Sequence, residues 1–317
     1  MGGIFRYSAH IYSMEMLQIP SPLERLILKG HDTSISCWVK RDDLIHPLIS
    51  GNKWRKLVYP LKEIIRTGRS GVITFGGAFS NHIVATAVAC QYLDLPCVGI
   101  IRGEAAAAKN PSLSTASKAG MKLHFVDRGS YRLKAAAESI NTIMSEYDNY
   151  EVLAEGGKHS LALEGVGEIV AEINMDMTDT PDYIITAVGT GTTFAGLSQA
   201  FSGELIGINV LKNRGVEKEI TDLLGTDQLP QDHCILNNYH FGGYAKYTDD
   251  LIDFMHVFYN ESGIKTDVVY TSKLFFAFQD LVKKDHFKSK SKIVIYHSGG
   301  EQGNAGMNYR FPGLVNF

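Results

Sequence analysis

The stretch Tyr183-Ile184-Ile185-Thr186-Ala187-Val188-Gly189-Thr190-Gly191-Thr192-Thr193 indicates the fold most clearly. Its first six residues are apolar or β-branched, which predicts a strand buried on both faces of a parallel sheet. Two glycines then allow a tight turn, and residues 192–201 continue as an expected helix. A strand, a glycine turn and a helix in this order are typical of an α/β protein.

The same alternation of strands and helices occurs before and after this stretch. The expected strands are 72–75, 97–101, 121–126, 151–153, 183–188, 205–210 and 292–296, and the expected helices are 81–93, 113–118, 131–147, 161–173 and 192–201. Strands that alternate with helices in this way form parallel sheets covered on both faces. We therefore predict an α/β fold with two open, twisted, mostly parallel sheets, helices on both faces, and a cofactor cleft between two domains.

A polar break near Asp148 sets the expected domain boundary. The smaller domain would comprise residues 46–149, and the larger would comprise residues 1–45 and 150–317. A chain of 317 residues with 44% hydrophobic composition is long enough for two cores. Ligands of such sheets bind at the carboxyl ends of strands, so the glycine turns at those ends are candidate sites.

Charge, hydropathy and cysteine content argue against several classes of protein. The net charge is −3 and the basic stretch at 283–292 is short, so no nucleic-acid partner is expected. No apolar stretch is long enough to span a membrane, and residues 1–10 lack the order of a secretory signal. The four cysteines are scattered without metal-ligand spacing, which fits a reducing cytoplasm. These features predict a cytoplasmic protein without a membrane partner.

The first candidate site is the run Gly189, Thr190, Gly191, Thr192 and Thr193. Its glycines permit the close approach of a phosphate, and the helix that follows begins with unpaired N–H groups. The run lacks the lysine of a P-loop and the third glycine of a dinucleotide fingerprint, so a single phosphate fits better than ATP or NAD. An ordinary strand-to-helix turn with threonine caps is the alternative.

A second glycine turn, Gly76-Gly77-Ala78-Phe79-Ser80-Asn81-His82, precedes the helix expected at 81–93. Ser80 and Asn81 either cap this helix or contact a bound ligand. His82 is a base, a simple first-turn residue or a group that orients a neighbour, and we favour the last two.

Lys53 offers an amine within the run Ser50-Gly51-Asn52-Lys53-Trp54-Arg55-Lys56-Leu57. Gly51 and Asn52 suit a tight turn, and Lys56 follows one helical turn later, where it could add positive charge near a phosphate. An amine that can form an imine, together with a cradle for one phosphate, is what an enzyme that uses pyridoxal 5'-phosphate needs.

Three further groups of residues are weaker candidates for a site. Asp42 and Asp43 are adjacent acids on an expected strand, where they would face opposite ways, so we do not predict a metal pair there. The tyrosines of residues 239–247 and Tyr270 have the composition of half-buried packing residues. The turn at 297–300 ends an expected strand and indicates a further wall of a ligand crevice.

Four of these runs together resemble one known family. They are Lys40-Arg41-Asp42-Asp43, Ser50 to Leu57, Gly77 to His82, and His297-Ser298-Gly299-Gly300, in this order. The sequence resembles the 1-aminocyclopropane-1-carboxylate deaminase and D-cysteine desulfhydrase family, which belongs to the tryptophan-synthase-β-like, fold type II enzymes of pyridoxal phosphate. The resemblance covers about residues 22 to 306. It implies a lyase or deaminase with a small amino-acid substrate, and a homodimer, which is common in the group.

The resemblance also implies a role for each matching position. Lys53 would hold the cofactor as an imine and move protons, and Asn81 would bond the ring hydroxyl. The implied cofactor-binding residues are Lys53, Lys56, Asn81, Gly189, Thr190, Gly191, Thr192, Thr193, Thr271 and Ser298. The implied substrate-binding residues are Ser80, Asn81 and His82. The implied catalytic residues are Lys53, Ser80, Tyr244 and Tyr270.

Several departures from the family pattern bear on the substrate. Ring-opening deaminases carry Glu at the position of Thr271, whereas desulfhydrase-like members carry Thr. Thr271 therefore favours β-elimination from D-cysteine. Phe79, Val84 and Glu301 replace the customary Gln, Arg and apolar residue, and Ser298 replaces Thr. A 1-aminocyclopropane-1-carboxylate deaminase, an amino-acid racemase or β-replacing synthase, and an inactive small-molecule-binding homologue are the alternatives.

Overall fold

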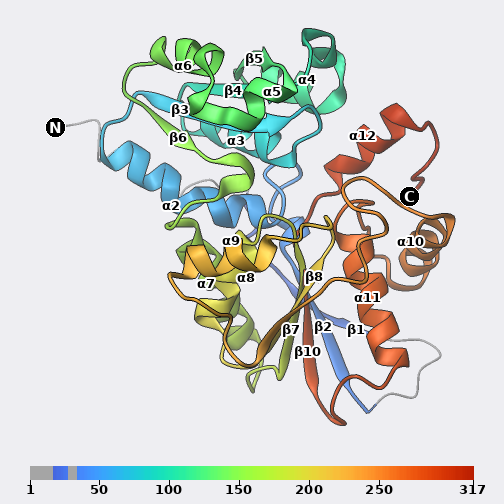
Figure 1. The fold of residues 1–317 in the computed structure, drawn as a ribbon. Helices are drawn as coiled ribbons and strands as arrows, with labels where there is room; N and C mark the ends of the chain where they lie inside the picture. Colours follow the sequence, from blue (N-terminus) through green and yellow to red (C-terminus); the bar gives the residue numbers. More distant parts are fainter. Residues whose placement is uncertain (1–16, 28–33) are drawn as a thin grey trace.

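Two sheets lie at opposite ends of the molecule, and helix α2 (Asn52–Arg66) packs against helices of both parts (Figure 1). The computed structural model describes residues 17–27 and 34–317. Residues 1–10, where the sequence predicts no secretory signal, lie outside the described residues. Within the described ranges, no helix has the length and apolar character needed to cross a membrane.

The larger sheet has six strands in the order β1-β2-β10-β7-β8-β9. All neighbours are parallel except β1 and β2. The strands are β1 (Leu23–Leu26), β2 (Ser36–Arg41), β7 (Tyr183–Val188), β8 (Glu204–Asn209), β9 (His233–Leu236) and β10 (Lys292–His297). Alternate residues of β7 enter separate cores, because Tyr183 and Ile185 face one side and Ile184 and Val188 the other.

The smaller sheet has four parallel strands in the order β5-β4-β3-β6. These are β3 (Gly71–Gly77), β4 (Cys97–Arg102), β5 (Lys122–Val126) and β6 (Tyr150–Leu153). Its two faces also enter separate cores, since Ile73 and Phe75 lie on one side and Val72 on the other. Both sheets are therefore buried on both faces, which explains their nearly continuous apolar strands.

Helices cover both faces of each sheet (Figure 1). Around the larger sheet are α7 (Ala162–Asp176), α8 (Thr192–Ala200) and α9 (Val216–Leu224) on one face, and α10 (Asp249–Ser262) and α11 (Thr271–Lys283) on the other. Around the smaller sheet are α2, α3 (Asn81–Tyr92) and α4 (Pro111–Lys118) on one face, and α5 (Arg128–Leu133) and α6 (Glu138–Ser145) on the other. Helix α12 (Gln302–Arg310) leaves the larger part and packs on α4. The predicted fold class is confirmed.

Some sequence predictions of local structure were wrong. The helix expected at 131–147 is interrupted between α5 and α6, where Lys134 has a φ of 52°. The strand expected at 151–153 exists, but it pairs with β3 in the smaller sheet, although the boundary at 149 had placed it with the larger part. Strands β1 and β9 and helices α9 to α11 had no counterpart among the expected elements.

Asp42 and Asp43 do not lie on a strand. They begin the 3₁₀ helix η1 (Asp42–Leu44), directly after β2. Asp42 is fully buried and accepts two hydrogen bonds from Arg55 at 3.0 Å, while Arg55 also donates to Glu172 of α7 at 2.6 and 2.8 Å. This buried network holds the start of α2 against β2 and α7, and so it positions the residues that precede Arg55.

Candidate active site

A cavity of about 440 Å³ lies at the carboxyl ends of strands from both sheets. Gly77 ends β3, Val188 ends β7, and Ser298 follows β10; all three line the cavity. Ligands of open parallel sheets bind in the crevice at the carboxyl ends of the strands, and the glycine turns at these ends meet at this cavity.

The start of α2 brings Lys53 into this cavity. Gly51 has a φ of 63°, and a Cβ at this position would lie 1.9 Å from the carbonyl oxygen of Ser298, so only glycine fits. Asn52 donates from its backbone N–H to that carbonyl at 3.1 Å and from Nδ2 to Thr193 Oγ1 at 2.9 Å. Its Oδ1 accepts a hydrogen bond of 2.6 Å from Lys53 Nζ. Asn52 thus connects Lys53 to the turn at 297–300 and to the run at 189–193.

Lys53 is half-buried and lines the cavity. Burial lowers the pKa of its ammonium group to about 8, although the carboxylate of Asp267 acts in the opposite direction. A larger share of the amine is therefore neutral near neutral pH than in an exposed lysine, and a neutral amine is the form that attacks an aldehyde.

The glycine-threonine run forms a second wall of the cavity. Gly191 has a φ of 80° and is the N-cap of α8, so the first N–H groups of this helix have no partner within the helix. Gly189, Thr190, Gly191 and Thr193 line the cavity. Thr192 is fully buried outside that lining, and its hydroxyl has no hydrogen-bond partner among the described residues.

Lys56 brings a second amine into the cavity. It is 4% exposed, and none of residues 17–27 and 34–317 accepts a hydrogen bond from it or forms an ion pair with it. Burial, together with the charge of Lys53, holds the pKa of Lys56 well below its ordinary value. A buried ammonium group without a countercharge is costly, so an anion that binds beside Lys56 would be favoured and would stabilise the charged form of this amine.

His82 lies in the first turn of α3 and is 2% exposed. The hydroxyl of Thr74 donates to the carbonyl of Leu153 at 2.9 Å, so it accepts from His82 Nε2 at 2.8 Å. The proton of the neutral ring therefore sits on Nε2, and Nδ1 is a buried acceptor without a partner among the described residues. Burial and the charges of Lys53 and Lys56 lower the pKa of His82 to about 3, so the ring stays neutral.

The neighbours of His82 combine capping with exposure to the cavity. Ser80 Oγ accepts from the N–H of Ile83 at 3.3 Å and caps α3, so the capping alternative holds for this residue. Asn81 donates to the carbonyl of Gly300 at 3.4 Å, but its Oδ1 is buried without a partner among the described residues. Both residues line the cavity, so capping does not prevent contact with a ligand.

Tyr244 and Tyr270 both line the cavity from the larger part of the molecule. Tyr244 is 50% exposed, whereas the ring of Tyr270 lies directly against Gly189. Burial raises the pKa of the Tyr270 phenol, so this group keeps its proton. Thr271 is fully buried and does not line the cavity, because its hydroxyl donates to Asp267 Oδ1 at 2.9 Å.

Most of the residues predicted from the sequence meet in this one cavity. Those that line it are Lys53, Lys56, Ser80, Asn81, His82, Gly189, Thr190, Gly191, Thr193, Tyr244, Tyr270 and Ser298, and those that do not are Thr192 and Thr271. Phe79 also lines the cavity, whereas Val84 and Glu301 do not. Sequence reasoning missed Asn52, Arg102, Glu155 and Arg310 as lining residues; only Asn52 carried a signal, as the residue between Gly51 and Lys53.

A family model described as pyridoxal-phosphate dependent enzyme matches residues 14–299. The chain belongs to the pyridoxal-phosphate-dependent enzymes. Its cofactor is accordingly pyridoxal 5'-phosphate, and the resemblance seen in the sequence is confirmed.

Matches to individual relatives extend along nearly the whole chain. The chain is 27% identical over 314 residues to the mitochondrial bifunctional D-cysteine desulfhydrase/1-aminocyclopropane-1-carboxylate deaminase of Arabidopsis thaliana, covering 91% of this chain and 78% of the relative. It is 25% identical over 308 residues to the D-cysteine desulfhydrase of Klebsiella pneumoniae, covering 90% and 93%. A crystal structure of an ACC deaminase homologue matches with a TM-score of 0.79 and 27% identity, covering 99% of this chain and 100% of that chain.

The residues present fit this cofactor. The neutral acceptor at His82 Nδ1, the buried acceptor at Asn81 Oδ1 and the unpaired Lys56 are polar groups that lack partners in the described part of the chain. They surround Lys53 together with a helix N-terminus, so the cavity offers an amine, an anion site and hydrogen-bonding groups to one ligand.

Proposed function

We propose that this protein is a lyase that catalyses β-elimination from a small amino acid such as D-cysteine, and that the products are a 2-oxo acid, ammonia and sulfide. The observation that carries the proposal is the meeting of Lys53, with its lowered pKa, and the start of α8 in one cavity. When bound, pyridoxal phosphate accommodates the negative charge that develops at the substrate α-carbon.

The residues around the cavity divide into an anion side and a reactive side. We propose that Lys56 and the first N–H groups of α8 bind the cofactor phosphate, and that Lys53 forms the covalent link. Asn81 is suited to bond the ring hydroxyl through its unpaired Oδ1. Ser298, whose carbonyl holds Asn52 in place, belongs to the far wall of the same site.

The proton transfers are assigned to Lys53 and the two tyrosines. Once the substrate has released it, Lys53 Nζ is an amine of lowered pKa and can take the α-proton. Tyr270 keeps its proton and is suited to donate it, and the more exposed Tyr244 stands on the same side of the cavity.

Substrate binding is assigned to the start of α3. Ser80 and Asn81 can hydrogen-bond the substrate carboxylate. His82 is neutral and presents an acceptor, so its contribution is to receive a hydrogen bond from the ligand rather than to attract the carboxylate.

The direct test is a spectral titration of the purified holoenzyme with D-cysteine, L-cysteine, D-serine and 1-aminocyclopropane-1-carboxylate, with assays for sulfide, ammonia and 2-oxo acid. We expect sulfide and pyruvate from D-cysteine with wild type and neither with Lys53→Ala. If the protein carries the cofactor but releases no sulfide from any cysteine, the substrate assignment is wrong.

Deamination of 1-aminocyclopropane-1-carboxylate is the second candidate function. The relative from Arabidopsis is named for both activities, and the matching crystal structure is named as an ACC deaminase homologue. Thr271 supports elimination over ring opening, since its hydroxyl is held by Asp267 and it adds no carboxylate to the site. Formation of 2-oxobutyrate from the cyclopropane substrate in the same titration separates the two activities.

We also propose a cytoplasmic location, a homodimer, and two domains each built around one sheet. Cys37, Cys90, Cys97 and Cys234 are free thiols, which fits a reducing compartment. The pairing of β6 with β3 supports a smaller domain that extends from about residue 46 past residue 149. Light scattering on the purified holoenzyme should give twice the mass of the chain, and the mass of a single chain would refute the dimer.

A further inference from the structure

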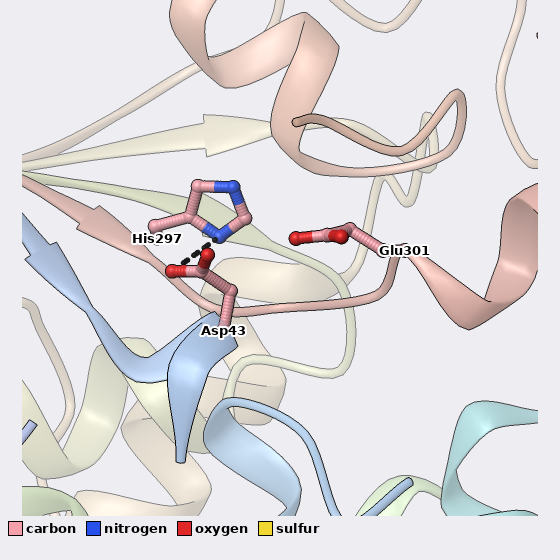
Figure 2. Close-up of side chains that lie close together, drawn as sticks. All are labelled: Asp43, His297 and Glu301. Carbon is pink, nitrogen blue, oxygen red and sulfur yellow. Dashed lines mark ion pairs between the residues drawn. The ribbon is translucent and has the colours of Figure 1, made fainter. Parts of the chain in front are cut away.

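The side chains of Asp43, His297 and Glu301 converge (Figure 2), and none of them lines the cavity. One ligand atom of each side chain lies within 4.8 Å of the other two. The three residues come from the end of β2, the end of β10 and the start of α12. None of them has a role in the proposed reaction, so the cluster requires a separate explanation.

The hydrogen bonds of His297 define which nitrogen carries the proton. His297 is fully buried, and its Nε2 lies 2.8 Å from the carbonyl oxygen of Lys265, which can only accept. The N–H of Gly299 points at Nδ1 from 3.2 Å, and it can only donate. The proton is therefore on Nε2, and Nδ1 presents a lone pair. A histidine whose other N–H is held by a backbone carbonyl is the usual form of a metal ligand.

Asp43 faces this lone pair. Its Oδ1 lies 3.4 Å from His297 Nδ1, marked by the dashed line in Figure 2, and its carboxylate is held by Arg41 at 2.7 to 3.2 Å. With the proton on Nε2, no hydrogen lies between Nδ1 and Oδ1. Two electron-rich atoms then face each other in a buried position, and the Arg41 guanidinium bound to the carboxylate offsets only part of this repulsion.

Glu301 adds a second carboxylate to the same position. Among the described residues, its side chain has no hydrogen-bond or ion-pair partner, although it is partly buried. The charge of Arg41 is shared with Glu24, which pairs with it on the surface side. The carboxylates of Asp43 and Glu301 therefore remain without a full countercharge, as two ligands for a divalent cation would.

We propose that Asp43, His297 and Glu301 form a binding site for one divalent transition-metal ion, and that zinc suits this ligand set best. Ligands at about 2.0–2.1 Å in a tetrahedral site lie roughly 3.3 Å apart, close to the separation of Nδ1 and Oδ1 in this structure. One imidazole nitrogen and two carboxylates leave a fourth position for water. Rotation of the partly buried Glu301 side chain would bring its carboxylate from within 4.8 Å to this spacing.

This site is distinct from the cofactor cavity but adjoins it. Gly299 contacts His297 Nδ1 through its N–H and also lines the cavity. A metal ion bound to Nδ1 would use the lone pair that now accepts the hydrogen bond from Gly299. Metal binding would therefore act on the turn that carries Ser298, without any contact between the metal and the substrate.

The test is the zinc content of the holoenzyme after removal of metals with a chelator, incubation with zinc chloride and desalting. All proteins in this test carry Cys234→Ser as a common background, which removes the exposed thiol as a possible zinc ligand. Glu301→Gln removes one ligand and keeps the side-chain size, and Glu301→Leu supplies an apolar residue in case Gln perturbs the fold. Glu217→Gln, at an exposed position of α9, is the matched control. Circular dichroism and the cofactor absorbance confirm that each variant is folded.

We expect one zinc ion per chain in the background protein and in Glu217→Gln. Both Glu301 variants should bind zinc at least about 100-fold more weakly, since even changes in the outer shell of a metal site cost roughly 10–100-fold in affinity. Absence of retained zinc in the background protein, or equal affinity in the Glu301 variants, would overturn the proposal. The hydrogen bonds of Asp43 with Arg41 and of His297 with Lys265 and Gly299 would then be the whole role of the cluster.

Discussion

Two buried groups of charged residues in this molecule differ in how well they are paired. Arg55 is fully buried, and its guanidinium is bound by the carboxylates of Asp42 and Glu172. Lys56, the next residue, is also buried and has no partner among the described residues. Two adjacent side chains of α2 thus have different roles.

This difference in pairing distinguishes the charged groups that stabilise the fold from those that are suited to bind a ligand. A buried charge with all of its hydrogen bonds satisfied contributes to a defined structure. A buried charge without a partner costs stability, and such a residue is typical of a binding site. On this comparison Arg55 is structural, and Lys56, His82 Nδ1 and Asn81 Oδ1 belong to the ligand site.

The largest effect on stability is expected from breaking the paired group. Arg55→Ala leaves Asp42 and Glu172 buried without their countercharge and should lower the free energy of unfolding by about 3–5 kcal/mol. Urea unfolding of the apoenzyme measures this change. Arg66→Ala, which removes an exposed pair with Glu63 on the same helix, should leave the free energy of unfolding nearly unchanged. Equal losses in the two variants would contradict a structural role for Arg55.

Removal of the Lys56 amine should affect the affinity for the cofactor and not the stability of the apoenzyme. Lys56→Met should leave the apoenzyme as stable as wild type or more so, because the buried charge has no partner to lose. Its affinity for pyridoxal phosphate should fall by about 10–100-fold, the equivalent of one charge-assisted hydrogen bond of roughly 1.5–3 kcal/mol. Equilibrium titration of the apoenzyme gives this affinity. The exposed Lys118→Met is the control, and loss of stability without loss of affinity would count against the assignment.

A smaller effect concerns the pH dependence of cofactor uptake. Burial lowers the pKa of Lys53 from 10.5 to about 8, so the reactive neutral amine disappears as the pH falls below about 8. The rate of imine formation by the apoenzyme should rise about tenfold per pH unit below this value and level off above it. Stopped-flow absorbance between pH 6.5 and 9.5 measures the rate. A rate that still rises tenfold per unit at pH 9.5 would indicate an unperturbed lysine.

The site was more predictable from the sequence than the contacts that support it. Short sequence patterns identify Lys53, the turn at 77–82 and the run at 189–193. Glycines between a strand and a helix permit a tight turn and leave the N–H groups of the helix start free to bind a ligand. Two of the three hydrogen bonds of Asn52, to Ser298 and Thr193, join residues more than 100 positions apart, and nothing in the local sequence specifies those partners. Thr271 was placed at the cofactor by analogy, whereas in the structure Asp267 binds its hydroxyl.

The same limit applies to the fold. The alternation of apolar strands and helices predicted the two parallel sheets, because both faces of each strand are buried. It could not assign β6 to a sheet, since strand pairing depends on tertiary contacts and the polar break near Asp148 lies within the smaller part. Asp42 and Asp43 were expected on a strand, but the chain turns into η1 directly after Arg41.

The central claim is that the amine of Lys53 carries the cofactor. Reduction of the holoenzyme with borohydride fixes the imine, and peptide mass spectrometry then locates the modified lysine. We expect the phosphopyridoxyl group on Lys53 alone, and no label in Lys53→Ala, which should also lack the imine absorbance. Labelling of Lys56 or of another lysine in place of Lys53, or an unmodified holoenzyme, would contradict the account.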